Sequence, residues 1–156
     1  MIKIPLHVLT NNWTEFDGVE PVSFLDIPDT EIMRFPHEVK YRLRAQLVTG
    51  GVLVEGTVET AIEAQCGRCL KEFERKVVHE DICHFYDDLG HDLLDVTEDI
   101  REDMILAIPI NPVCTEDCQG LCPDCGDDLN EAPCNCREQR TNKSVWKDLD
   151  DFEFEK

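Results

Sequence analysis

The chain has 156 residues, 15 basic and 34 acidic side chains, and a formal net charge of −19 at neutral pH. This length suits about one domain with a hydrophobic core, and so acidic a surface argues against generic binding to phosphate backbones. No run approaches the roughly 18 apolar residues of a membrane span, and the first residues lack the apolar core of an export signal, so we expect a cytoplasmic protein.

The charge is unevenly distributed. Residues 1–80 carry 9 basic and 13 acidic side chains, a net charge of −4, whereas residues 81–156 carry 6 basic and 21 acidic ones, a net charge of −15. The second half would attract basic proteins, or would simply be a solvated acidic surface.

The first 39 residues have a mixed pattern. We expect a short strand at residues 2–9, a turn-rich stretch through residues 11–18, and a second strand at Phe24, Leu25 and Ile27. The segment at residues 29–35 fits either one helical turn or a loop.

The middle of the chain has the alternation of half-buried strands. Apolar and polar residues alternate from Lys40 to Leu47, Thr49-Gly50-Gly51 supplies a hairpin turn, and a long return strand covers residues 52–65. A third strand is expected at residues 70–86, which places Cys66 and Cys69 at the tip of a hairpin. Together these strands predict an antiparallel meander with one solvated face.

One helix follows. Asp95 or Thr97 can cap it, acidic residues fill its first turns, and Pro109 ends it. Its apolar stripe consists of Ile100, Met104, Ile105 and Ile108. A helix packed on one face of an antiparallel sheet predicts an α+β fold.

Eight of the nine cysteines are closely spaced, which is typical of zinc knuckles. These candidate ligands are Cys66, Cys69, Cys114, Cys118, Cys122, Cys125, Cys134 and Cys136. They would make two tetrahedral zinc sites; disulfides or redox-active thiols are the alternative, and four thiolates also suit a single iron. Cys83 stands alone, and we expect a buried, unreactive thiol in a strand.

The cysteines can be shared between two ions in two ways. Loop-closure entropy favours Cys122, Cys125, Cys134 and Cys136 as one local set, which leaves Cys66, Cys69, Cys114 and Cys118 as the other. The alternative joins the two Cys-x-x-Cys pairs, as a zinc ribbon would. Neither arrangement leaves an open coordination position beside an acid or base, so we expect no enzymatic activity.

These patterns divide the chain into a sheet-plus-helix core at residues 1–112, a cysteine-rich metal-binding segment at 113–137 and an acidic tail at 138–156. Because the cysteine-rich segment has few large apolar residues, we expect metal to order it. In the tail, Trp146, Leu149 and Phe152 have the spacing of a short amphipathic helix, which would either dock on the core or bind a partner.

Three motifs resemble the YceD family of bacterial large ribosomal RNA subunit accumulation proteins, over about residues 41–136. They are Cys66-Gly-Arg-Cys69-Leu70, the helix end Ile105-Leu-Ala-Ile-Pro109, and Cys118-Gln-Gly-Leu-Cys-Pro-Asp-Cys-Gly126. The resemblance implies a cytosolic role in accumulating 23S ribosomal RNA and assembling the large ribosomal subunit, without known enzymatic activity. At residues 141–146 this chain departs from the Asp-Pro-Arg type of segment common in the family.

The basic residues of the first half offer a possible contact with RNA phosphates. They are Lys40, Arg42, Arg44, Arg68, Lys71, Arg75 and Lys76. They would form a local phosphate-contacting face, or would simply cover the wet side of the sheet. Three functions therefore remain open: a zinc-stabilised factor that contacts ribosomal RNA, a zinc-stapled acidic adaptor for a basic ribosomal protein, and a redox or metal-delivery protein.

Overall fold

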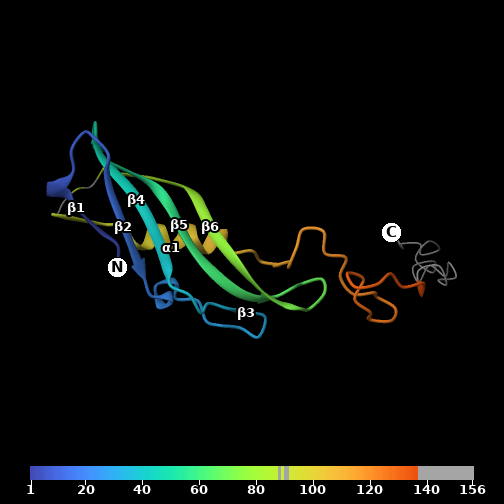
Figure 1. Ribbon diagram of the computed structural model, residues 1–156. Helices are drawn as coiled ribbons and strands as arrows, with labels where there is room; N and C mark the ends of the chain where they lie inside the picture. Colours follow the sequence, from blue (N-terminus) through green and yellow to red (C-terminus); the bar gives the residue numbers. More distant parts are fainter. Residues whose placement is uncertain (88, 90–91, 137–156) are drawn as a thin grey trace, which may run out of the picture.

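The computed structural model describes residues 1–87, 89 and 92–136 and contains a five-stranded antiparallel sheet covered by one helix (Figure 1). The sheet strands are β2 (Thr14–Glu20), β3 (Met33–Arg34), β4 (Val39–Val48), β5 (Gly51–Gln65) and β6 (Glu72–Tyr86). The helix is α1 (Thr97–Ala107), and a separate two-stranded ladder joins β1 (Lys3–Pro5) to β7 (Leu93–Asp95). Two 3₁₀ turns, η1 (Leu6–Val8) and η2 (Val22–Leu25), lie on either side of β2.

The long strand β5 lies at the centre of the sheet. On one side it pairs with β6 from Val52 to Gln65, with one register shift. On its other side it pairs with β4 and then, beyond the end of β4, with the short β3; β2 adds the outer strand next to β4. All these pairs are antiparallel, so the predicted meander of β4, β5 and β6 is confirmed.

The core lies between the sheet and α1. The alternate residues Val52, Val54, Val58 and Ile62 of β5 are fully buried on the face that the helix covers. From α1, Ile100 and Met104 are fully buried as well. The period-2 pattern of the strand and the apolar stripe of the helix therefore meet as the sequence predicts.

The β5–β6 ladder contains an irregularity at Gly56. The register shifts between Gly56 and Val58, and a Cβ atom on Gly56 would lie 2.2 Å from the carbonyl oxygen of Arg42. Glycine is required here because the backbone of the neighbouring strand approaches so closely.

Two expectations for the first 39 residues are wrong. Residues 14–20, expected within or beside a turn-rich stretch, form β2, because the ladder with β4 outweighs the local turn preference of Asp17 and Gly18. Instead of a second strand around Phe24, the 3₁₀ turn η2 follows Pro21 and ends at Asp26 in a left-handed conformation. The strand expected at residues 2–9 is shorter, because η1 follows β1 directly.

Cys83 is also placed differently from the expectation. It lies in β6 as predicted, but it is exposed, not buried. Its ladder partner is Glu55, a residue of the solvated face of the sheet, whereas the next residue, His84, faces α1 and its Nε2 lies 2.6 Å from Asp103 Oδ2. The alternation of the strand therefore turns the thiol outward.

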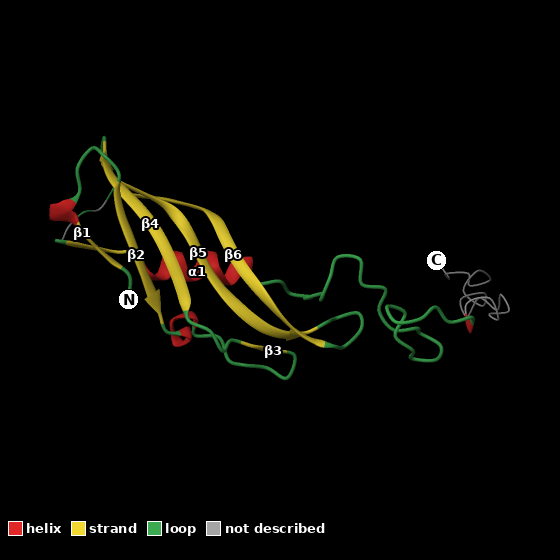
Figure 2. Ribbon diagram, in the orientation of Figure 1, coloured by secondary structure: helices red, strands yellow, loops and turns green. Residues whose placement is uncertain are grey.

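The chain leaves the helix–sheet body after α1. From Pro109 to residue 135 it is loop, apart from one isolated bridge between Leu121 and Asp128, and it extends past the tip of the β5–β6 hairpin (Figure 2). In the described ranges, no helix combines the length and the apolar character that crossing a membrane requires. The acidic tail expected at residues 138–156, with its possible docked helix, lies outside the described residues.

Candidate metal centre

The hairpin tip between β5 and β6 holds two cysteines in a tight turn. The Leu70 N–H group donates to the carbonyl oxygen of Cys66 at 3.0 Å, and the Cys66 N–H group donates to that of Lys71 at 2.9 Å. Leu70 takes a left-handed conformation, with a φ of 60°, directly after Cys69. This turn directs the Arg68 N–H group at Cys66 Sγ, 3.4 Å away, which is the hydrogen bond that a thiolate ligand accepts in a metal knuckle.

The segment after α1 is fastened to this tip by backbone hydrogen bonds. The Gly67 N–H group donates to Pro112 O at 2.8 Å, and the Leu121 N–H group donates to Arg68 O at 3.0 Å. The Arg68 guanidinium donates to the carbonyl oxygens of Glu116 and Cys118 at 3.1 and 2.9 Å. Cys114 and Cys118 are thereby held opposite Cys66 and Cys69.

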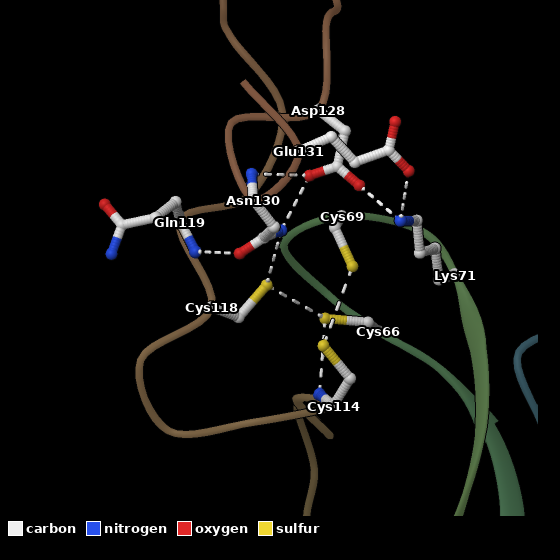
Figure 3. Close-up of polar contacts among 9 residues, drawn as sticks. All are labelled: Cys66, Cys69, Lys71, Cys114, Cys118, Gln119, Asp128, Asn130 and Glu131. Carbon is white, nitrogen blue, oxygen red and sulfur yellow. Dashed lines mark hydrogen bonds and ion pairs between the residues drawn. The ribbon is translucent and has the colours of Figure 1, made fainter. Parts of the chain in front are cut away.

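The first cysteine set, Cys66, Cys69, Cys114 and Cys118, has the dimensions of a tetrahedral thiolate site (Figure 3). Its four sulfur atoms lie within 4.8 Å of one another, with 3.8 Å between Cys66 and Cys118 and 3.7 Å between Cys69 and Cys114. With zinc–sulfur bonds of about 2.3 Å, a regular tetrahedron has sulfur–sulfur separations of about 3.8 Å. The four residues therefore fit one zinc ion.

The second cysteine set contains Cys122, Cys125, Cys134 and Cys136, whose sulfurs also lie within 4.8 Å of one another. The sets therefore follow the grouping favoured by loop closure, and the described residues do not bring the two Cys-x-x-Cys pairs together. The sets differ in exposure: Cys66, Cys69 and Cys118 are buried in the first, whereas only Cys122 is buried in the second and Cys125 is exposed.

The two Cys-x-x-Cys turns share one backbone pattern. In the second turn, the Gly126 N–H group donates to Cys122 O at 2.9 Å, the Cys122 N–H group donates to Asp127 O at 2.8 Å, and the Asp124 N–H group donates to Cys122 Sγ at 3.4 Å. Gly126, with a φ of 79°, takes the left-handed position that Leu70 takes in the first turn. The repeated pattern makes both turns competent to present a pair of sulfurs to a cation.

The electrostatics of both sets favour a bound cation. Burial opposes ionisation of Cys66, but N–H groups of Cys69, Cys114 and Arg68 directed at its sulfur lower its pKa to about 6. The Lys71 N–H group favours the Cys69 thiolate, yet burial and the neighbouring sulfurs outweigh it and raise the pKa of Cys69 to about 12. In the second set, N–H groups of Cys125 and Asp124 and a hydrogen bond with Cys134 lower the pKa of Cys122 to about 7. One thiolate is thus formed readily in each set, and the others ionise together only when a cation offsets their repulsion.

Such a site would be structural. Four thiolates fill a tetrahedral zinc site and leave no position for water or substrate. The ion would contribute a cross-link between the hairpin tip and the segment after α1, because Cys66 and Cys69 come from one and Cys114 and Cys118 from the other. Zinc and a single iron are both compatible with this ligand set.

The basic residues expected to contact RNA are spread over different surroundings. Lys40, Arg42 and Arg44 are exposed along β4 on the solvated face. Acidic residues border them in the ladders: Glu15 and Asp17 on β2, and Glu55 and Glu59 on β5. Arg44 Nη2 lies 2.6 Å from Glu55 Oε2 and its guanidinium stacks on the ring of Trp13, while Lys76 Nζ lies 2.8 Å from Glu59 Oε2.

The other three basic residues do not extend this stripe. Arg75 pairs with the buried Ile62, so it lies on the opposite face of the sheet from Lys76. Arg68 and Lys71 point toward the cysteine-rich segment, where Lys71 Nζ lies 2.7 Å from Asp128 Oδ2 and 2.9 Å from Glu131 Oε1. Two of the seven candidates, Arg68 and Lys71, therefore contact the cysteine-rich segment.

Several polar residues around the first set were not predicted. Asn130 Nδ2 donates to Cys118 Sγ at 3.5 Å, and Asn130 Oδ1 accepts the Gln119 N–H group at 2.7 Å. Asp128 Oδ1 accepts the Asn130 N–H group at 2.9 Å, an Asx turn. The Asp128-x-Asn130 spacing is a sequence signal for that turn, but no sequence pattern indicates which sulfur Asn130 reaches.

Comparison with known proteins identifies a family and several relatives. Residues 80–153, just under half of the chain, match the family described as "Large ribosomal RNA subunit accumulation protein YceD". This match contains six of the eight candidate ligands and excludes the hairpin tip with Cys66 and Cys69, which the resemblance from the sequence had included. No solved structure is significantly similar to the chain.

The relatives come from bacteria and a plant. An uncharacterized protein of Mycobacterium tuberculosis is 36% identical over 112 residues, which cover 62% of this chain and 54% of the relative. An uncharacterized protein of Mycobacterium leprae is 33% identical over 107 residues, covering 58% and 49%. "Large ribosomal RNA subunit accumulation protein YCED homolog 1, chloroplastic" of Arabidopsis thaliana is 33% identical over 64 residues, covering 41% and 19%. The chain thus spans about half the length of the mycobacterial relatives.

Proposed function

We propose that this chain, whose residues 80–153 match the YceD family, is a non-enzymatic, zinc-binding factor that supports 23S ribosomal RNA accumulation and large-subunit assembly in the cytoplasm. The family match is the observation that carries the ribosomal role. The two cysteine sets support the zinc-binding part, because their sulfurs lie at the separations of tetrahedral thiolate sites.

Zinc has a structural part in this proposal. Metal in the first set fixes Cys114 and Cys118 on the hairpin tip, and metal in the second set closes the loop that follows. The cysteine-rich segment then presents a defined, acidic surface at one end of the sheet. A reduced, cytoplasmic environment keeps the thiols available for metal.

A second candidate function is an acidic adaptor that holds a basic ribosomal protein without touching RNA. The charge pairing on the sheet favours it, because Arg44 and Lys76 have carboxylate partners within 2.8 Å. Within the described residues, Lys40, Arg42 and Arg75 form no ion pair and remain the candidates for a contact with phosphates. The surplus of acidic residues in the second half of the chain would attract a polycation.

The ribosomal role is tested by deleting the gene in its own host and measuring 23S relative to 16S ribosomal RNA. The proposal predicts a lower ratio and fewer large subunits in a sedimentation gradient. Complementation with the wild-type gene should restore both, while a Cys66→Ser, Cys69→Ser double variant should not. A Cys83→Ser variant is the matched control, because Cys83 lies outside both cysteine sets. An unchanged ratio in the deletion strain contradicts the ribosomal role.

The mode of binding is tested by charge reversal in the basic stripe. Arg42→Glu is compared with Lys3→Glu, which changes an exposed lysine of β1 by the same charge. Loss of co-sedimentation with large-subunit precursors in Arg42→Glu alone supports direct RNA contact. If both variants co-sediment like the wild type and binding to a basic ribosomal protein falls with added salt, the adaptor is supported instead.

A further inference from the structure

The loop of the second cysteine set contacts the first set directly. Asn130 lies between Cys125 and Cys134, two members of the second set, yet its side-chain amide donates to the sulfur of Cys118 in the first set at 3.5 Å (Figure 3). The same side chain accepts the N–H group of Gln119, the residue after Cys118, at 2.7 Å. Asn130, a residue of the second loop, therefore forms hydrogen bonds with the sulfur of Cys118 and with the backbone of the residue that follows it.

An ion pair holds this loop against the hairpin tip. Lys71, two residues after Cys69, places its ammonium 2.7 Å from Asp128 Oδ2 and 2.9 Å from Glu131 Oε1. Asp128 Oδ2 is shielded from solvent, so the Lys71 ammonium is its charge partner. The other carboxylate oxygen of Asp128 accepts both the N–H group and the side-chain amide of Asn130, at 2.9 and 2.7 Å. The chain of contacts runs from the hairpin through Asp128 and Asn130 to Cys118.

Burial of apolar side chains contributes little to the shape of this loop. Eight residues separate Cys125 from Cys134, and Leu129, the largest apolar side chain among them, is only half-buried. With so little apolar burial, the ion pair and hydrogen bonds must offset the ordering entropy of the loop, and that entropy cost falls when the two ends of the loop are tied together. An ion held by Cys125 and Cys134 ties them, and thereby positions Asn130 at Cys118.

We propose that the two cysteine sets bind metal cooperatively, and that Asn130 is the positioning residue through which occupancy of the second set strengthens metal binding at the first. An amide donor on a ligating sulfur is an outer-shell contact, and loss of such contacts typically weakens metal affinity by roughly 10- to 100-fold. By thermodynamic linkage, metal in the first set strengthens the second by the same factor. The inference depends on metal binding at both sets and not on the ribosomal role.

Exposure sets the order in which the sets lose their metal. Cys66 is fully buried and Cys69 and Cys118 are 4% exposed, whereas Cys125 in the second set is open to solvent. A chelator reaches the second set first. Once that set is empty, Asn130 no longer contacts Cys118, and the chelator removes the metal ion of the first set more readily.

The test is a double-mutant cycle on the full, reduced chain, with zinc affinity measured by competition against a chromophoric chelator. Cys122→Ser, which disables the second set, should weaken zinc binding at the first set by roughly 10- to 100-fold. Asn130→Ala should produce a similar loss in the wild-type background and almost none in the Cys122→Ser background, because the contact is already lost there. Asn135→Ala is the matched control, since this exposed asparagine lies between Cys134 and Cys136 and makes no hydrogen bond to the first set among the described residues.

A second readout covers the case in which Cys122→Ser does not fold. With cadmium in both sets, Asn130→Ala should shift the ¹¹³Cd resonance of the first set, and Asn135→Ala should not. The proposal is overturned if Asn130→Ala lowers zinc affinity equally in the wild-type and Cys122→Ser backgrounds, or lowers it in neither. A wild-type chain that binds two ions independently overturns this inference alone, whereas a chain that binds none overturns the zinc-binding function as well.

Discussion

The sheet–helix body, residues 1–112, and the cysteine-rich segment, residues 113–136, are ordered by different interactions. In the body, apolar side chains such as Ile62, Ile100 and Met104 are fully buried between the sheet and α1. In the described part of the segment, the buried residues are two cysteines and a glycine, Cys118, Cys122 and Gly120. Burial of apolar surface therefore stabilises the body, whereas in the segment the proposed metal ions would supply cross-links between sulfur atoms.

The largest effect expected from this difference is on metal content. Cys66→Ser should lose one metal ion per chain and keep the other, and Cys122→Ser should do the same, because each variant removes one ligand from a different set. Elemental analysis of the purified proteins measures this. Cys83→Ser should keep both ions, and a Cys66→Ser or Cys122→Ser variant that also keeps both ions would contradict the grouping.

A substitution in the apolar core should instead destabilise the body and leave the metal sites of the segment unchanged. Met104→Ala should lower the free energy of unfolding of the body by about 2–5 kcal/mol, because it leaves a cavity under α1. Denaturant unfolding followed by circular dichroism measures the loss, and the metal content should stay unchanged. Leu106→Ala, on the same helix but 81% exposed, should change stability by less than about 0.5 kcal/mol; equal losses in both variants would argue against the core described here.

A pH-dependent contribution to the free energy of unfolding is expected where β6 packs against α1. The Tyr86 hydroxyl donates to the Asp99 carboxylate, and burial, followed by this hydrogen bond, raises the pKa of Tyr86. Because the folded state favours the neutral phenol, the contribution is complete below the unfolded pKa of about 10 and is lost as the pH rises above it.

Tyr86→Phe should therefore cost about 1.5–3 kcal/mol near neutral pH, since the hydrogen bond is made to a charged group. The difference from the wild type should narrow as the pH rises toward about 11. Urea unfolding of both proteins across this range measures it. A difference that does not depend on pH would show that the lost contact is packing alone.

Two glycines of the segment should differ in what they tolerate. Gly120 and Gly126 both have left-handed conformations, but a Cβ atom on Gly120 would lie 3.0 Å from Arg68 O, whereas one on Gly126 would meet nothing within 4 Å. Gly126→Ala should cost about 1 kcal/mol from the backbone alone. Gly120→Ala should cost up to about 3 kcal/mol and loosen the hydrogen bond from Leu121 to Arg68.

The rate of amide hydrogen exchange at Leu121 reports how far each glycine substitution loosens the hydrogen bond to Arg68. Exchange should be faster in Gly120→Ala than in Gly126→Ala. The reverse order would show that the segment does not lie against the hairpin tip as described.

The smallest effects are expected for two exposed lysines, one on the body and one beside the segment. Lys76→Ala removes an ion pair with Glu59 on the open face of the body and should cost less than about 1 kcal/mol, with a further decrease in salt. Lys71→Ala should instead lower zinc affinity, because it leaves the shielded carboxylate oxygen of Asp128 without its cation. Parallel unfolding and chelator competition on both variants distinguish them, and a loss of zinc affinity in Lys76→Ala would contradict the assignment.

The sequence predicted the parts of the fold that depend on simple periodicity. The alternation at Lys40–Leu47 and residues 52–65 became β4 and β5, and the apolar stripe that includes Ile100 and Met104 became the buried face of α1. The strand at residues 14–20 was missed, because Asp17 and Gly18 favour turns locally and only the long-range ladder with β4 makes them strand.

The cysteine-rich segment shows what the sequence could and could not indicate. Loop-closure entropy predicted the four members of each set, because nearby ligands lose the least entropy when they come together. The roles of Lys71 and Asn130 could not be predicted, since they depend on how one irregular loop lies against the hairpin tip. Spacing indicates which residues are able to bind metal, but the contacts that support those ligands come from tertiary structure.

Removal of metal from the reduced 156-residue chain shows whether metal orders the cysteine-rich segment. A two-dimensional amide NMR spectrum recorded before and after treatment with a strong chelator reports on the body and the segment at the same time. We expect the amides of residues 113–136 to move to unfolded positions while those of β4, β5 and β6 stay dispersed, and we expect added zinc to restore the first spectrum. A segment that keeps its dispersed amides without metal would contradict this expectation.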